Sequence, residues 1–150
     1  MSHSFTSSLF HCTFSTAGRR PTIHEESRER LWAYMGGIAR RNNMKALAVG
    51  GVADHAHILL SLPAMMSISK AMQLIKGGSS KWVHDEFPQH QLFSWQEGYG
   101  AFSIGVAQEA TTIEYIWNQE THHRKTTFQD EFILFLKKHR MEYDPVEIWK

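Results

Sequence analysis

The stretch His55 to Leu62 is the part of this chain that most constrains its fold. Side chains alternate across a strand, so Ala56, Ile58, Leu60 and Leu62 would share one face and His55, His57, Leu59 and Ser61 the other. Pro63 follows directly and cannot continue a central strand. The stretch therefore predicts a buried strand that begins with two neighbouring histidines on one face.

The preceding and following segments supply the other elements of a sheet. Their periodicity and their turn and cap residues predict strands at 9–15, 45–52 and 101–107, helices at 25–42 and from the N-cap Ser67 to about 83, a turn at 18–21 and a loop at 88–98. The order strand, helix, strand, strand, helix, strand predicts an α+β fold. The sheet is antiparallel and ferredoxin-like (RRM-like), with helices on one face.

Two further helices are predicted at the C-terminal end. Thr111 or Thr112 caps the first, which carries Tyr115 and Gln119 one turn apart and therefore on one face. The second begins near Thr126 or Thr127, where Thr126-x-x-Gln129 fits a capping box. Its apolar stripe is predicted to be core or interface without chemistry and consists of Phe128, Phe132, Phe135 and Leu136.

These elements suggest a candidate metal site. If the helix of Tyr115 packs over the histidine strand, two imidazoles and the amide oxygen of Gln119 could hold a divalent cation beside a phenol. Three such ligands leave about three octahedral positions for phosphate and water, which suits Mg²⁺ or Mn²⁺. Tyr34, Tyr99 and Tyr143 are rival candidates for that phenol.

Composition sets broad limits. With 150 residues, of which 42% are hydrophobic, the chain is expected to form one domain over residues 1–150. The single cysteine, Cys12, excludes a disulfide framework and a cysteine-built zinc site. No apolar run approaches the ~20 residues of a membrane span. We therefore expect a cytoplasmic protein without a membrane segment.

Several motifs in order resemble the HUH single-tyrosine transposases, which move insertion sequences as single-stranded DNA, and their REP-associated tyrosine transposase relatives. The resemblance covers nearly the whole chain. Its motifs are the first strand with its basic turn (10–21), Asp54 to Leu60, Lys76-Gly77, Ser79-Ser80, Trp95 to Ser103, Tyr115 to Gln119, and His122-His123. Ala56 replaces the bulky apolar residue that the family places between the two histidines, which we expect to affect packing rather than ligation.

The resemblance implies roles for four residues. His55, His57 and Gln119 would be the ligands of Mg²⁺ or Mn²⁺, and Tyr115 the nucleophile that takes the 5′ phosphate and releases a 3′ hydroxyl. It also implies single-stranded DNA with hairpin ends as substrate. The enzyme would be a homodimer, in which the tyrosine helix of one protomer completes the histidine site of the other.

Two assignments near the site stay open. His122 or His123 could replace Gln119, and a site with three imidazoles would favour zinc and hydrolysis. Asp54 could orient an imidazole or be only a turn residue, and the turn is slightly favoured. No general base can be identified from the sequence.

The net charge of +1 does not by itself suggest a nucleic-acid protein. Basic residues do cluster locally, and Arg19, Arg20, Lys76 and Lys81 are the candidate DNA contacts. Two other functions are kept beside the transposase: a non-cleaving module that binds single-stranded nucleic acid, and a zinc hydrolase.

Overall fold

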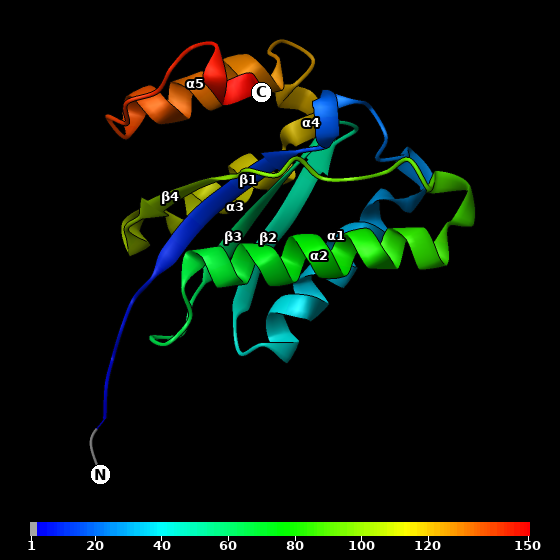
Figure 1. Ribbon diagram of the computed structural model, residues 1–150. Helices are drawn as coiled ribbons and strands as arrows, with labels where there is room; N and C mark the ends of the chain where they lie inside the picture. Colours follow the sequence, from blue (N-terminus) through cyan, green and yellow to red (C-terminus); the bar gives the residue numbers. More distant parts are fainter. Residues whose placement is uncertain (1–2) are drawn as a thin grey trace.

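A computed structural model of the chain describes residues 3–150 (Figure 1). Its principal elements are β1 (Leu9–Ser15), α1 (Glu25–Arg41), β2 (Lys45–Val52), β3 (His55–Ser61), α2 (Ile68–Glu86), β4 (Gly100–Ile104), α3 (Glu109–Trp117), α4 (Gln119–His122) and α5 (Phe128–Lys138). The sheet has the order β2-β3-β1-β4, and every neighbouring pair is antiparallel. The predicted α+β fold and the predicted order of elements are confirmed.

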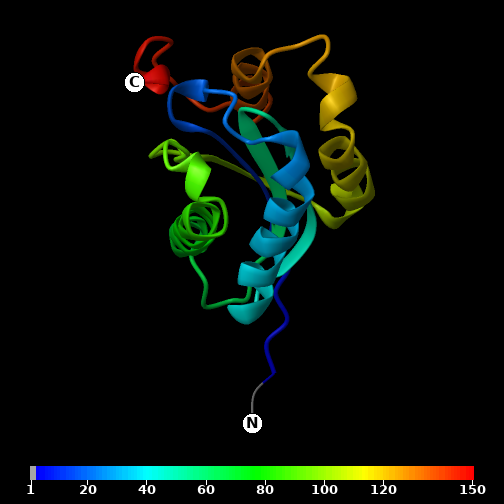
Figure 2. The ribbon, with the colours of Figure 1, turned by 90° about the vertical axis from the view of Figure 1, so that its right-hand side faces the viewer.

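The sheet lies between two groups of helices, as the view along its edge shows (Figure 2). Helices α1 and α2 pack together on one face, and α3 packs against β2 and β3 on the other. Helix α5 lies on the same side as α3, where Phe132 and Phe135 contact the ring of Phe102 on β4. The strands β1 and β3 are therefore covered on both faces.

The face toward α1 and α2 holds the main apolar core. Cys12 and Phe14 of β1 and Ile58 of β3 point into it and are fully buried. They meet Met35 of α1 and Ile75 of α2, whose helical spacing places them on the inner stripes of their helices. This core holds the sheet and its two helices together, and no residue of the histidine pair belongs to it.

One local prediction on α2 is confirmed, and one of its glycines has a packing role. Ser67 is the N-cap, and its hydroxyl accepts a hydrogen bond from the backbone N–H of Lys70. Gly78 lies where α1 and α2 approach closely, because a Cβ on this residue would stand 2.9 Å from Cδ1 of Ile38. Gly78 therefore serves packing between two helices of the same chain.

Three predicted element boundaries differ from the structure. The last strand ends at Ile104, because Val106–Gln108 form a 3-10 turn that leads into α3. Thr127, rather than Thr126, caps α5 by accepting a hydrogen bond from Asp130, so the predicted capping box does not form. The tyrosine helix starts at Glu109 and ends at Trp117, and Gln119 opens the separate helix α4. Among residues 3–150, no helix combines the length and apolar character needed to cross a membrane.

Candidate active site

The histidine pair begins β3 and points away from the main core. His55 and His57 lie on the same face, with Ala56 between them directed into the apolar core. Both imidazoles are completely buried. Across the antiparallel ladder, Thr13 of β1 is the register partner of His57 and Ser15 that of His55. The central strands therefore hold both rings in fixed positions.

A second residue orients each imidazole through its Nδ1 atom. His55 Nδ1 donates to Oδ1 of Asp54 at 2.7 Å, and His57 Nδ1 lies 2.8 Å from Nε2 of His11 on β1. Asp54 is therefore more than a turn residue, which corrects the slight preference drawn from the sequence. His11 was not predicted, although strand alternation places it on the same face as Thr13 and Ser15. Both Nε2 atoms remain directed into the space between β3 and the C-terminal helices.

Gln119 and Tyr115 both reach this space although the helix breaks between them. The backbone leaves helical geometry at Asn118, between α3 and α4. Gln119 is nevertheless buried, and its Oε1 accepts a hydrogen bond from His55 Nε2 at 3.1 Å. Its Nε2 donates to the backbone carbonyl of Tyr115 at 3.1 Å, which fixes the amide with its oxygen toward the histidine. The structure thus brings His55, His57, Tyr115 and Gln119 together within one chain.

Glu131 of α5 lies at the centre of the site and was missed in the sequence. It is 2% exposed, and its Oε1 lies 2.9 Å from His57 Nε2 and 3.5 Å from His55 Nε2. Its Oε2 lies 3.1 Å from Nε2 of His122 and 3.1 Å from Nε2 of His123. The predicted apolar stripe of this helix does pack against the sheet, where Phe132 and Phe135 meet Phe102, whereas Glu131 beside it was not among the predicted site residues. A signal was present, because Glu131 is an acid on the same helical face as Phe128 and Phe135.

The Tyr115 hydroxyl joins the same network. It donates a hydrogen bond to Oε2 of Glu131 and lies 3.1 Å from Nε2 of His122. The phenol ring is partly buried and packs edge-on against His11, His57 and Phe135. Tyr115 is therefore held in one orientation beside the histidines of its own chain.

Burial and nearby charges shift several pKa values in the site. Burial lowers the pKa of His57 to about 4 and that of His11 to about 3. Burial also opposes charge on His55, but hydrogen bonds to Asp54 and Glu131 outweigh it and raise its pKa to about 9. His55 then donates from both ring nitrogens, as the cationic form does. Within the β3 pair, His55 is therefore the ring that this geometry favours as the cation.

The two groups that could exchange a proton are also perturbed. Burial and the nearby Glu131 carboxylate raise the pKa of Tyr115 well above its usual range. Burial alone would raise the pKa of Glu131, but hydrogen bonds from His123, His55 and His57 outweigh it and hold that pKa far below the usual range. These contacts therefore favour a protonated phenol and an ionised carboxylate.

The donor set fits a divalent cation. Ligand atoms of His55, His57, His123 and Glu131 all lie within 4.8 Å of one another, and Gln119 adds an amide oxygen beside His55. Adjacent ligands of an octahedral ion with bonds of about 2.1 Å lie about 3.0 Å apart. The separations from Glu131 to His57 and from Gln119 to His55, 2.9 and 3.1 Å, match this value. These buried residues could hold a metal ion.

The candidate DNA contacts lie outside this centre. The Arg19 guanidinium stacks over Trp149, and Arg20 follows in the turn after β1. Lys76 donates to the carbonyls of Glu97 and Gly98, while the exposed Lys81 pairs with Asp85. All four candidates are therefore placed on the turn after β1 or on α2, away from the histidines.

The rival tyrosines have other surroundings. Tyr34 stacks on Trp82, the ring of Tyr99 lies under the Lys76 ammonium, and Tyr143 lies in the segment after α5.

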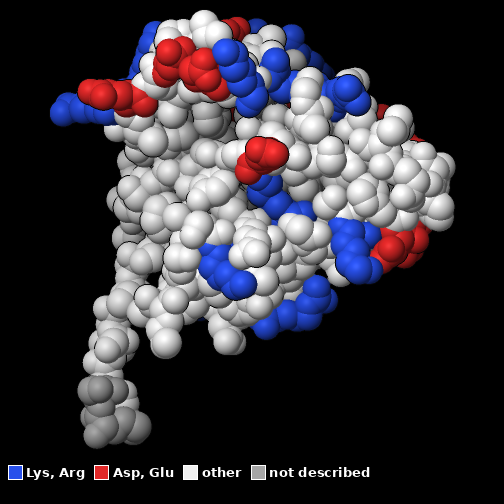
Figure 3. Space-filling model, in the orientation of Figure 1, with Lys and Arg blue, Asp and Glu red and all other residues white. Residues whose placement is uncertain are grey.

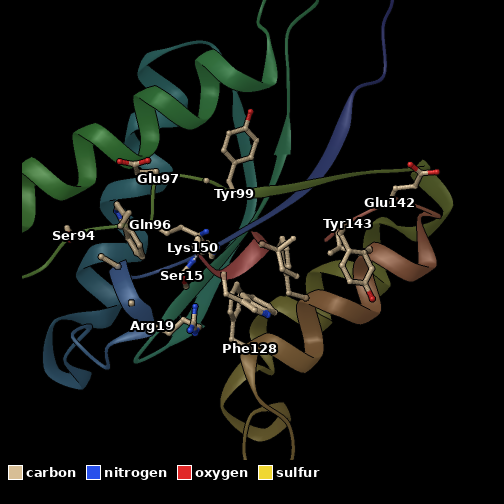
Figure 4. A pocket seen from close by; sticks show the side chains of 18 residues that line it. Ser15, Arg19, Ser94, Gln96, Glu97, Tyr99, Phe128, Glu142, Tyr143 and Lys150 are labelled. Carbon is tan, nitrogen blue, oxygen red and sulfur yellow. Dashed lines mark hydrogen bonds between the residues drawn. The ribbon is translucent and has the colours of Figure 1, made fainter. Parts of the chain in front are cut away.

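Two cavities flank α5. The larger, about 800 Å³, lies between the end of β1, the loop before β4 and the C-terminal segment, and Figure 4 shows its lining. Aromatic and basic side chains contribute to this lining, among them Tyr99, Tyr143, Trp149, Arg19 and Lys150. The second, about 350 Å³, is lined by Tyr115 together with other residues of both layers, including His11, Phe135, Lys138 and His139.

Surface charge is mixed, in keeping with the net charge of +1. On the face shown in Figure 3, Lys and Arg form separate groups, some of them beside Asp and Glu, rather than one continuous basic surface. Any DNA contact on this face therefore depends on local placement of cations.

Comparison with known proteins gives consistent results. A family model described as "Transposase IS200 like" matches residues 4–119. Transposases for insertion sequence element IS200 from Salmonella typhimurium and Salmonella typhi are each 27% identical over 125 residues, which cover 79% of this chain and 81% of theirs.

Two solved structures share the fold. A putative transposase from Deinococcus radiodurans has a TM-score of 0.64 at 21% identity, covering 79% of this chain and 95% of its own. A REP-associated tyrosine transposase bound to a REP hairpin has a TM-score of 0.59 at 16% identity, covering 82% of this chain and 72% of its own.

An antiparallel sheet that presents a His-x-His pair to a tyrosine on a following helix defines the class of HUH single-tyrosine transposases, and the predicted resemblance to this class is confirmed. Within that class, the chain belongs to the family of IS200-like transposases.

Proposed function

We propose that this transposase nicks and rejoins single-stranded DNA through a 5′-phosphotyrosine intermediate on Tyr115, with a divalent metal ion at His55, His57 and Gln119. The observation that carries the proposal is the placement of the Tyr115 hydroxyl in one hydrogen-bonded network with this buried pair of histidines. One hydrogen-bond partner satisfies a buried tyrosine hydroxyl, whereas this one meets both a carboxylate and an imidazole beside the candidate ligands.

Each residue has a defined part in the reaction. When bound at His55, His57 and Gln119, Mg²⁺ or Mn²⁺ would supply positive charge to the scissile phosphate and to the leaving 3′ oxygen. Asp54 and His11 hold the two imidazoles through their Nδ1 atoms and leave both Nε2 atoms for ligation. The Tyr115 oxygen attacks phosphorus and its proton passes to water, the bond from phosphorus to the 3′ oxygen breaks, and that oxygen takes up a proton from water to leave as a 3′ hydroxyl. A second 3′ hydroxyl reverses these steps and joins strands without ATP.

We propose DNA with hairpin ends as the substrate. One structural relative was solved with a REP hairpin bound, and our chain shares its fold. We propose that unpaired nucleotides bind in the 800 Å³ cavity, because its aromatic rings can stack on bases and Arg19 and Lys150 can contact phosphates. Arg20, Lys76 and Lys81 are proposed as weaker phosphate contacts.

The proposal is tested by trapping the covalent intermediate. Labelled single-stranded oligonucleotides from the DNA flanking the gene, with foldback ends, are incubated with the protein and Mn²⁺. On a denaturing gel, label moves with the protein, and EDTA or Tyr115→Phe removes it while DNA binding persists. Tyr34→Phe is the matched control, because Tyr34 stacks on Trp82 outside the site. An adduct that survives Tyr115→Phe would sink the assignment.

The two alternative functions give other results in the same assay. DNA binding without an adduct on any foldback substrate would favour a non-cleaving module. Stoichiometric zinc with esterase activity and no DNA affinity would favour a hydrolase. The position of His123 is the observation that favours a hydrolase, because its ligand atom lies within 4.8 Å of those of His55 and His57 and would give zinc a third imidazole.

We also propose a homodimer, on the strength of the family resemblance. Tyr115 and the histidine pair meet within one chain, so a protomer can supply its own nucleophile. Light scattering gives the oligomeric state. Mixing a His57→Ala protein with a Tyr115→Phe protein tests exchange, because an adduct regained in the mixture requires a tyrosine that acts on the partner's metal.

A further inference from the structure

We propose that Glu131 binds the catalytic metal through Oε1 while Oε2 holds the Tyr115 hydroxyl, so that one carboxylate on α5 fixes the nucleophile relative to the ion. This inference rests on the proposed function and adds to it a fourth ligand and a positioning role. It also makes α5 part of the active site rather than a covering helix.

The geometry of Oε1 is that of a ligand. It faces the Nε2 atoms of both His55 and His57, at 3.5 and 2.9 Å, and these are the atoms that remain after Asp54 and His11 have taken the Nδ1 positions. An ion bound by both imidazoles would lie in the space that Oε1 borders. A carboxylate is also the ligand type that Mg²⁺ and Mn²⁺ prefer over a neutral amide.

The charge balance around Glu131 points the same way. Its side chain is 2% exposed, and a buried carboxylate requires a counter-charge. Within residues 3–150, its ion-pair partners are the histidines at 55, 57, 122 and 123, and none is a lysine or arginine. A structural carboxylate is commonly paired with a permanent cation. Here the surrounding groups are imidazoles, whose ring nitrogens can bind metal as well as protons.

The second oxygen connects this site to the nucleophile. Oε2 accepts the hydrogen bond from the Tyr115 hydroxyl, and His122 lies beside both groups. Phe135, one turn further along α5, packs against the rings of Tyr115 and His57. Helix α5 therefore contacts the phenol at its hydroxyl and at its ring. A metal ion bound to Oε1 would fix α5, and with it the tyrosine.

Metal affinity is the first test. Mn²⁺ binding to the full chain is measured by calorimetry and by the loss of the free-ion EPR signal, for wild type and for Glu131→Gln, His57→Ala and Asp130→Asn. Asp130 is the matched control, because it is the neighbouring acid on α5 but is exposed. We expect Glu131→Gln to weaken Mn²⁺ binding at least about tenfold. That is the smallest loss of affinity typical when a residue that only hydrogen-bonds a metal ligand is removed, and Glu131 is proposed as a ligand itself. Asp130→Asn should leave it unchanged.

The outcomes separate this inference from the proposed function. If His57→Ala abolishes Mn²⁺ binding but Glu131→Gln leaves it unchanged or tightens it, Glu131 is not a ligand and the inference is wrong, while the metal site stands. If His57→Ala has no effect either, the proposed metal site itself has failed. Weakened binding in both variants, with Asp130→Asn unchanged, supports the inference.

Hydrogen exchange of the wild-type protein gives a test that needs no variant. If Glu131 is a ligand, Mn²⁺ ties α5 to β3 and slows amide exchange along residues 128–138. If the ion instead displaces Glu131, exchange there becomes faster or does not change, and the inference is overturned. This readout remains valid if Glu131→Gln fails to fold.

A third measurement addresses the tyrosine. The chain contains 4 tyrosines, so 3-fluorotyrosine labelling gives few ¹⁹F signals, and Tyr115→Phe assigns the one that matters. In wild type we expect Mn²⁺ to broaden the Tyr115 signal most strongly. In Glu131→Gln at saturating Mn²⁺ that broadening should fall by at least about twofold, because the phenol is no longer held. Equal broadening in both proteins would overturn the positioning role.

Discussion

The two faces of β3 carry alternate residues of one strand, yet they are stabilised in different ways. On the face toward α1 and α2, Ala56 and Ile58 enter an apolar core where fit and burial suffice. On the other face, His55 and His57 are equally buried, but each ring nitrogen has a specific polar partner. The comparison teaches that burial alone does not identify a core residue, because neighbours with 0% exposure have unrelated roles.

Among changes on the face of β3 that carries His55 and His57, His57→Ala is expected to have the largest effect. The substitution removes one proposed metal ligand and one of the imidazole partners of Glu131. We expect adduct formation to fall by about a thousandfold or more, since the charge that a metal ion supplies accounts for several kcal/mol of transition-state stabilisation. Single-turnover cleavage of a labelled oligonucleotide measures this. A fall of less than tenfold in adduct formation would contradict the separate roles of the two faces of β3.

Ile58→Ala is the corresponding change on the apolar face, one residue along the strand. Ile58 is fully buried, so the variant loses about 2–5 kcal/mol of unfolding free energy through lost burial and the cavity left behind. Mn²⁺ affinity of the folded protein should stay within about twofold of wild type. Urea unfolding and calorimetry give the two quantities, and a large loss of metal affinity would contradict the separation.

Asp54→Asn tests how much the orientation of the His55 ring contributes to Mn²⁺ affinity. The amide still fills the space but no longer accepts a charge-assisted hydrogen bond from His55. We expect Mn²⁺ affinity to fall about 10- to 100-fold with little change in stability. Asp85→Asn provides the control, because that carboxylate pairs with Lys81 at the surface. If Asp54→Asn binds Mn²⁺ like wild type, the hydrogen bond from His55 to Asp54 does not contribute to metal binding.

Lys76 is a charged residue on the apolar side of the sheet, and its substitution is expected to have the smallest effect on stability. Burial lowers its pKa to about 8, so between pH 8 and its ordinary value near 10.5 the unfolded chain binds more protons than the folded one. Stability therefore rises with pH across that window, by about 1 kcal/mol after allowance for solvent screening of a half-buried group. Lys76→Met should lose this rise. Thermal unfolding from pH 7.5 to 10.5, compared with wild type, checks it.

The fold was largely predictable because its signals are local. Alternation in 55–62, helical spacing in α1 and α2, and the Ser67 cap each depend on residues close in sequence. The histidine pair, Tyr115 and Gln119 were found for the same reason and by resemblance to a family. Their juxtaposition in the structure agrees with that prediction, although the break at Asn118 places Tyr115 and Gln119 on separate helices.

What sequence reasoning missed depends on distant contacts. His11 and Glu131 lie in segments whose apolar patterns are sufficient to explain a strand and a helix. Their partner is His57, far along the chain from both, and no local pattern records that pairing. Asp54 was ambiguous because a turn before a strand favours aspartate on its own account. In each case one polar residue beside apolar neighbours was the available clue.

The order of synthesis determines when the parts of the site come together. These parts are spread from His11 on β1 to Glu131 on α5. During synthesis β1 and β3 emerge well before α3, α4 and α5, so a growing chain carries His11, His55 and His57 without Tyr115, Gln119 or Glu131. The proposed site is therefore complete only once α5 has docked on a sheet that is already built.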